Sequence, residues 1–228
     1  MKVLIACESS GTVRDAFIAL GHDALSCDLM PADNGGPHYQ GDVLDILNEG
    51  WDLMIAHPPC TYLSSSGMHW TTRGKRDPQL TEDALEFVRL LMNAPIERIA
   101  IENPIGVIST RIRKPNQIIQ PYQFGHDASK ATCLWLKGLP ALIPTEMVDA
   151  RMVCKDCKNT QKWSTCCDKC QGELMYRWAN QTDSGQNRLA PSADRWKQRS
   201  KTYEGIANAM AQQWGRHEQR MDASSLLF

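Results

Sequence analysis

One cysteine of the chain stands where it could act as a nucleophile. Cys60 follows Pro58 and Pro59, and these prolines follow an apolar run at residues 53–56. Proline restricts the backbone and favours turns, so the pattern predicts a strand that ends in a stiff turn with a thiol beyond it. Several enzyme families use a thiolate as nucleophile, and ligands of α/β sheets bind at the carboxyl ends of strands. The alternative is a buried cysteine that only closes a strand.

Four further cysteines have the spacing of metal ligands. Cys154 and Cys157 form one Cys-x-x-Cys pair, and Cys167 and Cys170 form a second, nine residues later. Four thiolates in this pattern can bind Zn(II) tetrahedrally, so we expect a structural zinc ribbon. Cys166 is interpreted as a bystander that could exchange with Cys167. The ribbon could contact DNA or could only organise a loop, and the sequence favours neither.

The elements that must position these cysteines are those of an α/β protein. Short apolar runs alternate with segments of helical periodicity, which predicts a largely parallel sheet. Helices are expected at residues 12–20, 80–92 and 203–220. The expected strands include residues 3–6, 24–27, 53–56, 99–101 and 131–136.

The 228 residues suffice for one substantial core and a small appended module. We predict an α/β domain at 1–145, a zinc-ribbon insert at 146–180, and a basic segment with a C-terminal helix at 181–228. The composition, 42% hydrophobic and 22% charged, is that of a globular protein without a bilayer span or signal peptide. We therefore expect a cytoplasmic protein with no membrane partner. The net charge of -1 leaves nucleic-acid binding to local basic segments, and the sequence predicts no oligomeric state.

A second group of residues has the order of a nucleotide-binding edge. Glu8, Ser9, Ser10 and Gly11 follow the first apolar run and open a helix, where backbone amides approach nucleotide-like ligands. The carboxylates that could follow them at ribose and adenine positions are Asp28 and Asp42. In the alternative interpretation, Glu8 and Asp28 cap helices and Asp42 begins a turn.

In this order the motifs resemble those of the DNA cytosine carbon-5 methyltransferases. The segment from Glu8 to Gly11 resembles the family's cofactor loop, Asp28 its ribose ligand, and Asp42 its adenine-side motif. The loop from Pro58 to Ser64 is similar to the catalytic proline-cysteine loop, and Glu102-Asn103-Pro104 is similar to the Glu-Asn-Val motif. A looser match, from Arg199 to Ala207, resembles the closing motif that returns to the cofactor pocket.

The resemblance implies a Rossmann-like class I S-adenosylmethionine-dependent methyltransferase with a four-cysteine zinc-ribbon insert. It implies that the Cys60 thiolate adds to carbon 6 of cytosine in DNA, that Glu102 holds ring nitrogen 3, and that carbon 5 takes the methyl group. Pro58 would border the cofactor, and a target within a duplex would be flipped out. The residues expected near nucleic acid are Ser64, Lys130, Arg188, Arg195, Lys197 and Arg199.

The chain also departs from the family pattern. Ser9 and Ser10 replace glycines, and His57 replaces a small residue, either as a packing residue, which we favour, or as a hydrogen-bond donor. The family's Gln-x-Arg-x-Arg strand has no clean copy, and its place is filled by residues 129–133. One alternative is therefore an enzyme acting on RNA, a nucleotide or a modified pyrimidine. Another is a catalytically silent nucleic-acid-binding protein with an antirestriction or regulatory role. The short recognition region would suit a small phage or restriction-modification protein.

Overall fold

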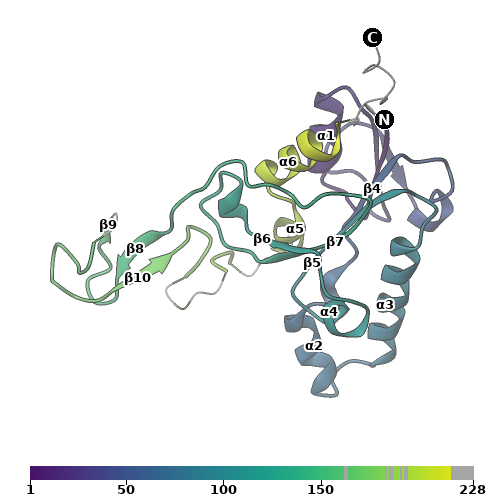
Figure 1. Cartoon of the computed structure of the whole chain (residues 1–228). Helices are drawn as coiled ribbons and strands as arrows, with labels where there is room; N and C mark the ends of the chain where they lie inside the picture. Colours follow the sequence, from purple (N-terminus) through teal and green to yellow (C-terminus); the bar gives the residue numbers. More distant parts are fainter. Residues whose placement is uncertain (162–163, 183, 185–186, 191, 193–194, 217–228) are drawn as a thin grey trace, which may run out of the picture.

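The structure is a computed structural model that describes residues 1–161, 164–182, 184, 187–190, 192 and 195–216. Seven strands form one sheet in the order β3-β2-β1-β4-β5-β7-β6 (Figure 1). All neighbours pair in parallel except β7, which is antiparallel to both β5 and β6. The strands are β1 (Lys2–Ala6), β2 (Asp23–Asp28), β3 (His38–Gln40), β4 (Leu53–Ala56), β5 (Arg98–Pro104), β6 (Gln117–Ile119) and β7 (Thr132–Lys137). The predicted α/β fold class is confirmed.

Helices cover both faces of this sheet, which explains why β4 and most of β1 are apolar on consecutive residues. On one face, α1 (Thr12–Ala19) and α6 (Glu204–Trp214) pack over β1 through Phe17 and Trp214. On the other face, α3 (Gln79–Met92) and the 3-10 turn η1 (Val43–Asp45) enclose a second cluster that includes Leu85. The sheet is therefore the buried middle layer of a three-layer domain.

The strand order reverses direction between β1 and β4. The chain moves from β1 outward to β2 and β3, and then returns to the other side of β1 with β4. At such a switch point the loops after neighbouring strands turn to opposite faces and leave a crevice at the carboxyl ends. The loop after β1 and the Cys60 loop after β4 therefore share one edge of the sheet.

Short elements occupy the connections between the strands. The 3-10 turn η2 (Cys60–Tyr62) and α2 (Ser65–Thr72) follow β4, and α4 (Ile108–Arg111) follows β5. The turn η3 (Pro121–Gln123) precedes β7, and α5 (Arg195–Ser200) precedes α6. These connections carry Cys60 and the predicted nucleic-acid residues Ser64, Lys130, Arg195, Lys197 and Arg199.

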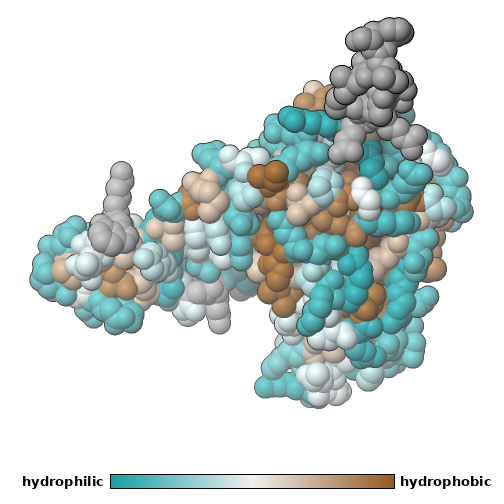
Figure 2. Space-filling view, viewed as in Figure 1, coloured by the Kyte–Doolittle hydropathy of each residue, from teal (hydrophilic) through white to brown (hydrophobic). Residues whose placement is uncertain are grey.

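The cysteine insert, residues 146–180, holds a second, three-stranded sheet. Its strands are β8 (Arg151–Cys154), β9 (Thr160–Gln161) and β10 (Leu174–Arg177), antiparallel in the order β10-β8-β9. Figure 1 shows this sheet projecting away from the main body beyond β6, and Figure 2 shows mostly polar and intermediate residues on its visible face. Within its described residues, the buried side chains are Met152, Cys154 and Cys167. The insert therefore lacks an apolar core of its own.

The predicted strands and the helices α1 and α3 are confirmed, and two details differ. Leu20 was expected on the packed side of the first helix but lies at its carboxyl end with 49% of its surface exposed. The last helix ends at Trp214, and residues 217–220 of its predicted range lie outside the described residues, as does the rest of the tail. Among the helices that the structure describes, none has the length and hydrophobicity required to span a membrane.

Candidate active site and zinc centre

A cavity of about 360 Å³ lies at the carboxyl ends of β1, β2 and β4. Its walls combine apolar side chains with the carboxylates Asp28 and Asp42, both predicted from the sequence. The turn at Pro58 and Pro59, which precedes Cys60, closes one side. Other lining residues, which the motifs had not indicated, include Cys7, Leu29, Tyr62, Asp83 and Phe87.

The two thiols beside this cavity are neutral. Burial, reinforced by the charge of Asp28, raises the pKa of Cys7, and the same two causes raise the pKa of Cys27 to about 12. Both therefore remain protonated at neutral pH. The negative charge at this edge comes from Asp28 and Asp42, and the remaining wall is suited to an apolar ring.

The cofactor-like loop after β1 is stabilised by Glu8. Its buried carboxylate accepts hydrogen bonds from the backbone of Val13 at 2.8 Å and from the Ser10 hydroxyl at 3.0 Å. Glu8 therefore satisfies the free amides at the start of α1, where a negative charge is also favoured by the helix dipole. Its carboxylate points to the helix and not into the cavity. Glu8 therefore caps the start of α1, as the alternative interpretation expected. It could affect a bound cofactor only by holding the loop in shape.

Gly11 is required by the shape of the same loop. It begins α1 with φ of 70°, and a Cβ there would lie 2.3 Å from the Arg14 guanidinium and 2.5 Å from Asn34 Oδ1. Arg14 is fully buried and donates to Asn34 and to the Gly35 carbonyl. The arginine thus fastens the loop after β2 against the loop after β1, which fixes one end of the cavity.

Asp28 and Asp42 each make one local hydrogen bond. Asp28 Oδ1 accepts from the backbone of Met30 at 2.9 Å, and Asp42 Oδ1 accepts from the backbone of Leu44 at 3.0 Å. Asp42 thereby begins η1, as the alternative interpretation expected. Both nevertheless line the cavity, so the structural and the ligand-binding interpretations of these residues are compatible.

The Cys60 loop is held in place by β5, the strand that carries Glu102, and by the segment that follows this strand. The Asn103 side chain is buried and donates to the Pro58 carbonyl at 2.6 Å. Farther along, Val107 donates its backbone N–H to the Leu63 carbonyl at 2.8 Å. Gly106 permits this approach, because a Cβ there would lie 1.9 Å from the same carbonyl. The loop after β5 thus fixes the loop after β4.

Cys60 itself is exposed at the start of η2. Desolvation by the surrounding protein and the charge of Glu102 raise its pKa, while the charges of Lys130 and Arg199 act in the opposite direction. The free thiol is therefore mainly protonated at neutral pH. Its reactivity depends on the balance between one carboxylate and two cations that come from different parts of the chain.

Glu102 lies beside this thiol and is almost enclosed. Its side chain is 13% exposed, and Oε2 lies 3.0 Å from His57 Nδ1. Burial alone would raise the pKa of Glu102, but the hydrogen bond to His57 and the charge of Lys130 outweigh it and lower the pKa. The carboxyl group is therefore ionised. His57 is buried as a packing residue would be, but the hydrogen-bonding alternative is the one that the structure supports.

The predicted nucleic-acid residues fall into two groups. Lys130 joins the site, with Nζ donating to the Arg199 carbonyl at 3.0 Å, and α5 brings Arg199 within electrostatic reach of Cys60. Lys197, on the same helix, forms an ion pair with Asp33 of the loop after β2. The helix α5 thus links the cavity side to the Cys60 side.

The remaining predicted contacts lie elsewhere. The Ser64 hydroxyl is buried and caps α2 by accepting from the Gly67 backbone at 3.2 Å, which makes it a structural residue. Arg188 is exposed, and its backbone N–H donates to the Asn180 carbonyl next to the base of the cysteine insert. Arg195 is half-buried at the start of α5.

The four predicted zinc ligands form one cluster. All the sulfur atoms of Cys154, Cys157, Cys167 and Cys170 lie within 4.8 Å of one another, with the closest pairs at 3.4 Å. Four sulfurs at about 2.3 Å from a tetrahedral zinc ion would be separated by about 3.8 Å. The donor set therefore fits Zn(II), and Cys166 lies apart, its thiol donating to Gln171.

The two halves of the cluster repeat one backbone geometry. The residue after each pair, Lys158 or Gln171, has φ of 60° and donates its N–H to the carbonyl of the first cysteine. Burial would raise the pKa of Cys167, but the backbone amides of Cys170 and Lys169 donate to the sulfur and lower it to about 6. A sulfur with these donors is prepared for metal binding as a thiolate.

The base of the insert is attached to the segment that carries Lys130. Trp178 stacks on Tyr122 with ring centroids 4.5 Å apart, and Asp127 accepts from the Ala179 backbone at 2.9 Å. The Asn180 side chain donates to the Ser129 carbonyl at 2.9 Å. These contacts fix the base of the insert against the segment that carries Lys130, a residue of the candidate active site.

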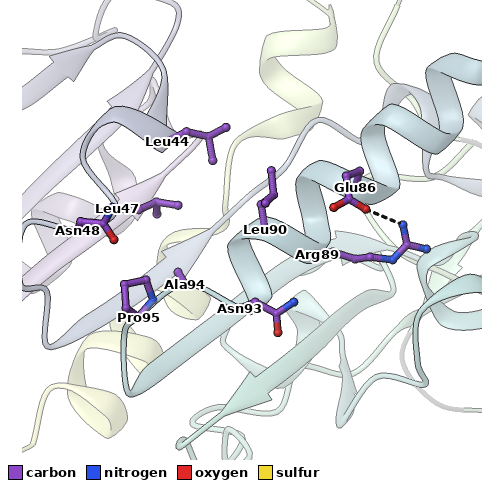
Figure 3. A pocket seen from close by; sticks show the side chains of 9 residues that line it. All are labelled: Leu44, Leu47, Asn48, Glu86, Arg89, Leu90, Asn93, Ala94 and Pro95. Atoms are coloured by element: carbon purple, nitrogen blue, oxygen red, sulfur yellow. Dashed lines mark hydrogen bonds and ion pairs between the residues drawn. The ribbon is translucent and has the colours of Figure 1, made fainter.

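A second groove, of about 450 Å³, lies between η1 and the carboxyl-terminal half of α3 (Figure 3). Leucine side chains and the Glu86–Arg89 ion pair line it. It contains none of the predicted residues and neither a cysteine nor a histidine. The predicted residues Asp28, Asp42 and Pro58 therefore line the smaller cavity and not this groove.

Two solved methyltransferase structures are similar to this chain. One is an E. coli protein described as a candidate DNA modification methyltransferase encoded within a prophage, with 14% identity and a TM-score of 0.42. The other is the methyltransferase EhMeth of Entamoeba histolytica, with 13% identity and a TM-score of 0.45. Each match covers 65% of this chain, which spans 52% and 58% of the two structures. No protein-family model and no curated protein sequence matches the chain.

Proposed function

We propose that the protein is an S-adenosylmethionine-dependent methyltransferase that acts on carbon 5 of a pyrimidine, with cytosine in DNA as the base implied by the sequence resemblance. The observation that carries the proposal is the meeting of Cys60 and Glu102 beside a cavity bounded by Asp28 and Asp42. A candidate nucleophile, a candidate ring ligand and a cofactor-sized space thereby lie together at the ends of β2, β4 and β5 and at the start of η1.

The cavity has the features that S-adenosylmethionine requires. Asp28 and Asp42 offer carboxylate oxygens to hydroxyl and amino groups, and the apolar wall, with Phe87 and Leu29, suits a flat adenine ring. When bound, the cofactor supplies an electrophilic methyl group. Pro58 and Pro59 separate the cavity from Cys60, so a base held at Cys60 would lie next to the methyl donor.

The chain's own residues supply the remaining chemistry. The Cys60 thiolate forms a bond to carbon 6 as the carbon 5–carbon 6 double bond opens, which makes carbon 5 nucleophilic. After the methyl group has moved to carbon 5, loss of the carbon-5 proton to a base restores the double bond and expels the thiolate. Lys130 and Arg199 favour the thiolate, and Glu102 holds the ring edge.

DNA is the proposed partner, and zinc the proposed structural metal. Lys130 and Arg199 act on the Cys60 thiol through their charges, and the exposed Arg188 donates its backbone N–H to the Asn180 carbonyl at the base of the insert. Their positive charges would bind phosphates on either side of an extruded base. Zn(II) at the four sulfurs would hold the insert in shape, with its base attached near Lys130.

A substrate other than cytosine in DNA is the second candidate. The observation that favours it is the hydrogen bond between His57 and Glu102, which makes the ring ligand of this site an acceptor. RNA, a nucleotide or a modified pyrimidine would use the same nucleophile and the same cavity.

Nucleoside mass spectrometry of DNA, RNA and nucleotide pools from cells that express the protein tests the proposal. We expect a 5-methylpyrimidine above its level in cells without the protein for the wild type and for Cys166→Ser, and no increase for Cys60→Ser. Calorimetry with S-adenosylhomocysteine should give similar binding for all three proteins. A product that persists in Cys60→Ser would contradict the mechanism, and absence of binding at millimolar ligand would contradict the cofactor assignment.

A further inference from the structure

A histidine that does not line the cavity is hydrogen-bonded to the loop after β2. His38 begins β3 and is paired in the sheet with Ser26 of β2, two residues before Asp28. Its Nε2 lies 3.0 Å from the Met30 carbonyl oxygen, and its Nδ1 lies 2.8 Å from Ser26 Oγ. Because a carbonyl oxygen can only accept, Nε2 carries a hydrogen and donates it to Met30.

The ring of His38 is held on its other side by buried polar groups. Ser26 is fully buried, and its hydroxyl also accepts from Arg14 Nη1 at 3.0 Å. The hydroxyl can donate to His38 Nδ1 or accept from it, so the bond to Met30 persists whether or not Nδ1 carries a hydrogen. His38 is therefore a donor with a fixed position.

The residue that His38 holds is the one that orients Asp28. The Met30 backbone N–H donates to Asp28 Oδ1 at 2.9 Å. This bond uses one carboxylate oxygen and leaves the other to a ligand in the cavity that Asp28 lines. The two groups of Met30 thus connect His38 to the carboxylate at the cavity wall.

The rest of the loop after β2 is fixed by other contacts. Hydrogen bonds fasten residues 33–35 to the loop after β1 and to α1. At the cavity end, the Gln40 side chain approaches the Leu29 carbonyl at 3.4 Å, a longer contact than the one that His38 makes. The cavity end of the loop therefore depends mainly on His38.

We propose that His38 is a positioning residue of the cofactor site: by holding the Met30 carbonyl, it fixes the residue whose N–H orients Asp28. This inference rests on the proposed function and specifies how its cofactor site is prepared. A site that is already ordered in the free protein binds more tightly, because less conformational freedom is lost on binding. His38 touches no reacting atom, so its effect should appear in the affinity for the cofactor.

Two substitutions that differ by one methylene group separate the two contacts of His38. The side-chain amide of His38→Gln can reach the position of Nε2, whereas the shorter side chain of His38→Asn reaches only the position of Nδ1, next to Ser26. Calorimetry with S-adenosylhomocysteine should give an affinity about five- to tenfold weaker for His38→Asn and close to that of the wild type for His38→Gln. An equal loss in both variants would contradict the role of the donor.

Two further variants control for folding. His38→Leu has no donor and should bind S-adenosylhomocysteine as weakly as His38→Asn, and it replaces that variant if the asparagine disrupts β3. His69→Ala, at an exposed position on α2, should bind as the wild type does. Thermal unfolding of the unliganded proteins shows which variants are folded.

A double-mutant cycle tests whether the effect passes through Asp28. In Asp28→Ala there is no carboxylate to orient, so adding His38→Asn should weaken S-adenosylhomocysteine binding by about twofold or less. Asp42→Ala instead removes the carboxylate at the start of η1, which is hydrogen-bonded to Leu44 and not to Met30. Adding His38→Asn there should cost the full factor of about five to ten, because the two sites are independent.

The outcomes separate this inference from the proposed function. Binding by His38→Asn and His38→Leu within about twofold of the wild type would overturn the inference and leave the proposed function standing. Equal further losses in the Asp28→Ala and Asp42→Ala backgrounds, the result of a merely structural role, would do the same. No binding of millimolar S-adenosylhomocysteine by the folded wild type would overturn the cofactor assignment and this inference with it.

Discussion

The main domain and the cysteine insert reach a defined shape by different physical means. The domain buries whole strands, with every residue from Val3 to Ala6 inaccessible to solvent. The insert buries little more than Met152 and two of its cysteine sulfurs within the part that the structure describes. Burial of apolar surface is the main source of stability for the domain. For the insert, binding of a metal would be the main source of stability. One chain thus combines a domain with a large apolar core and a segment whose four clustered cysteines could hold a metal.

This difference suggests separate roles for the two regions, chemistry for the domain and substrate binding for the insert. The residues proposed for chemistry are Cys60, on a loop, and Glu102, on β5, and hydrogen bonds of the domain hold both segments. The described residues of the insert contribute nothing to that centre, but the insert is attached to the segment that carries Lys130. Changes in the insert should therefore alter substrate binding, and changes in the domain should alter the chemistry.

The largest expected effect comes from removing one sulfur of the zinc cluster. Cys154→Ser should abolish a contribution on the order of 10 kcal/mol to folding of the insert, because metal binding and folding are coupled there. Hydrogen exchange should then lose protection over residues 151–177, while calorimetry still detects S-adenosylhomocysteine. Cys166→Ser is the matched control and should behave as the wild type. Unchanged protection of the insert in the variant, or in chelator-treated protein, would show that the insert does not depend on a metal for its shape.

A smaller effect is expected in the domain at Asn103. Asn103→Ala removes the buried donor to the Pro58 carbonyl and should cost about 1–3 kcal/mol in the free energy of unfolding. Denaturant unfolding followed by tryptophan fluorescence measures this cost. Asn93→Ala, at an exposed helix end, should change the stability by less than about 0.5 kcal/mol. Equal effects of the two substitutions would show that the Asn103 contact does not hold the loop.

The smallest effects should be those of nearby charges on the reactivity of Cys60, and Lys130→Gln and Glu102→Gln should change it in opposite directions. Because the pKa of Cys60 is raised, alkylation by iodoacetamide should be slow at neutral pH and should accelerate as the pH rises and the thiolate forms. Lys130→Gln should slow alkylation severalfold, since a cation that favours the thiolate is lost. Glu102→Gln should accelerate it severalfold, since a carboxylate that opposes the thiolate is lost. Peptide mass spectrometry assigns the rate to Cys60, and changes of the same sign in both variants would contradict the arrangement.

The elements that the sequence predicted well are those whose pattern has one physical solution. A run such as residues 53–56, apolar on both faces, favours a central strand, and the four cysteines of the two pairs converge on one cluster that could hold a metal. Cys60 and Glu102 were proposed as site residues because they follow such apolar runs. Their meeting was predictable from the order of the motifs and not from either residue alone.

The rest depends on contacts between distant segments that no local pattern encodes. Glu8 could reach the cavity or the start of α1, and only the positions of the Val13 and Arg14 amides decide for the helix. Ser64 could bind a phosphate but caps α2 instead. The signal for His57 was its departure from the family's small residue. Its partner, 45 residues away, becomes apparent only when β4 and β5 pair.

The central claim, that Cys60 adds covalently to a pyrimidine, is tested most directly by trapping the adduct. Single-stranded DNA of random sequence with 5-fluorodeoxycytidine or 5-fluorodeoxyuridine is incubated with the protein and S-adenosylmethionine. Fluorine at carbon 5 cannot leave as a proton does, so a methylated adduct would persist. The account predicts a protein–DNA species of the summed mass plus one methyl group, mapped to the Cys60 peptide and absent in Cys60→Ser. Protein that binds S-adenosylhomocysteine but forms no adduct with either base, or an adduct that survives Cys60→Ser, would contradict it.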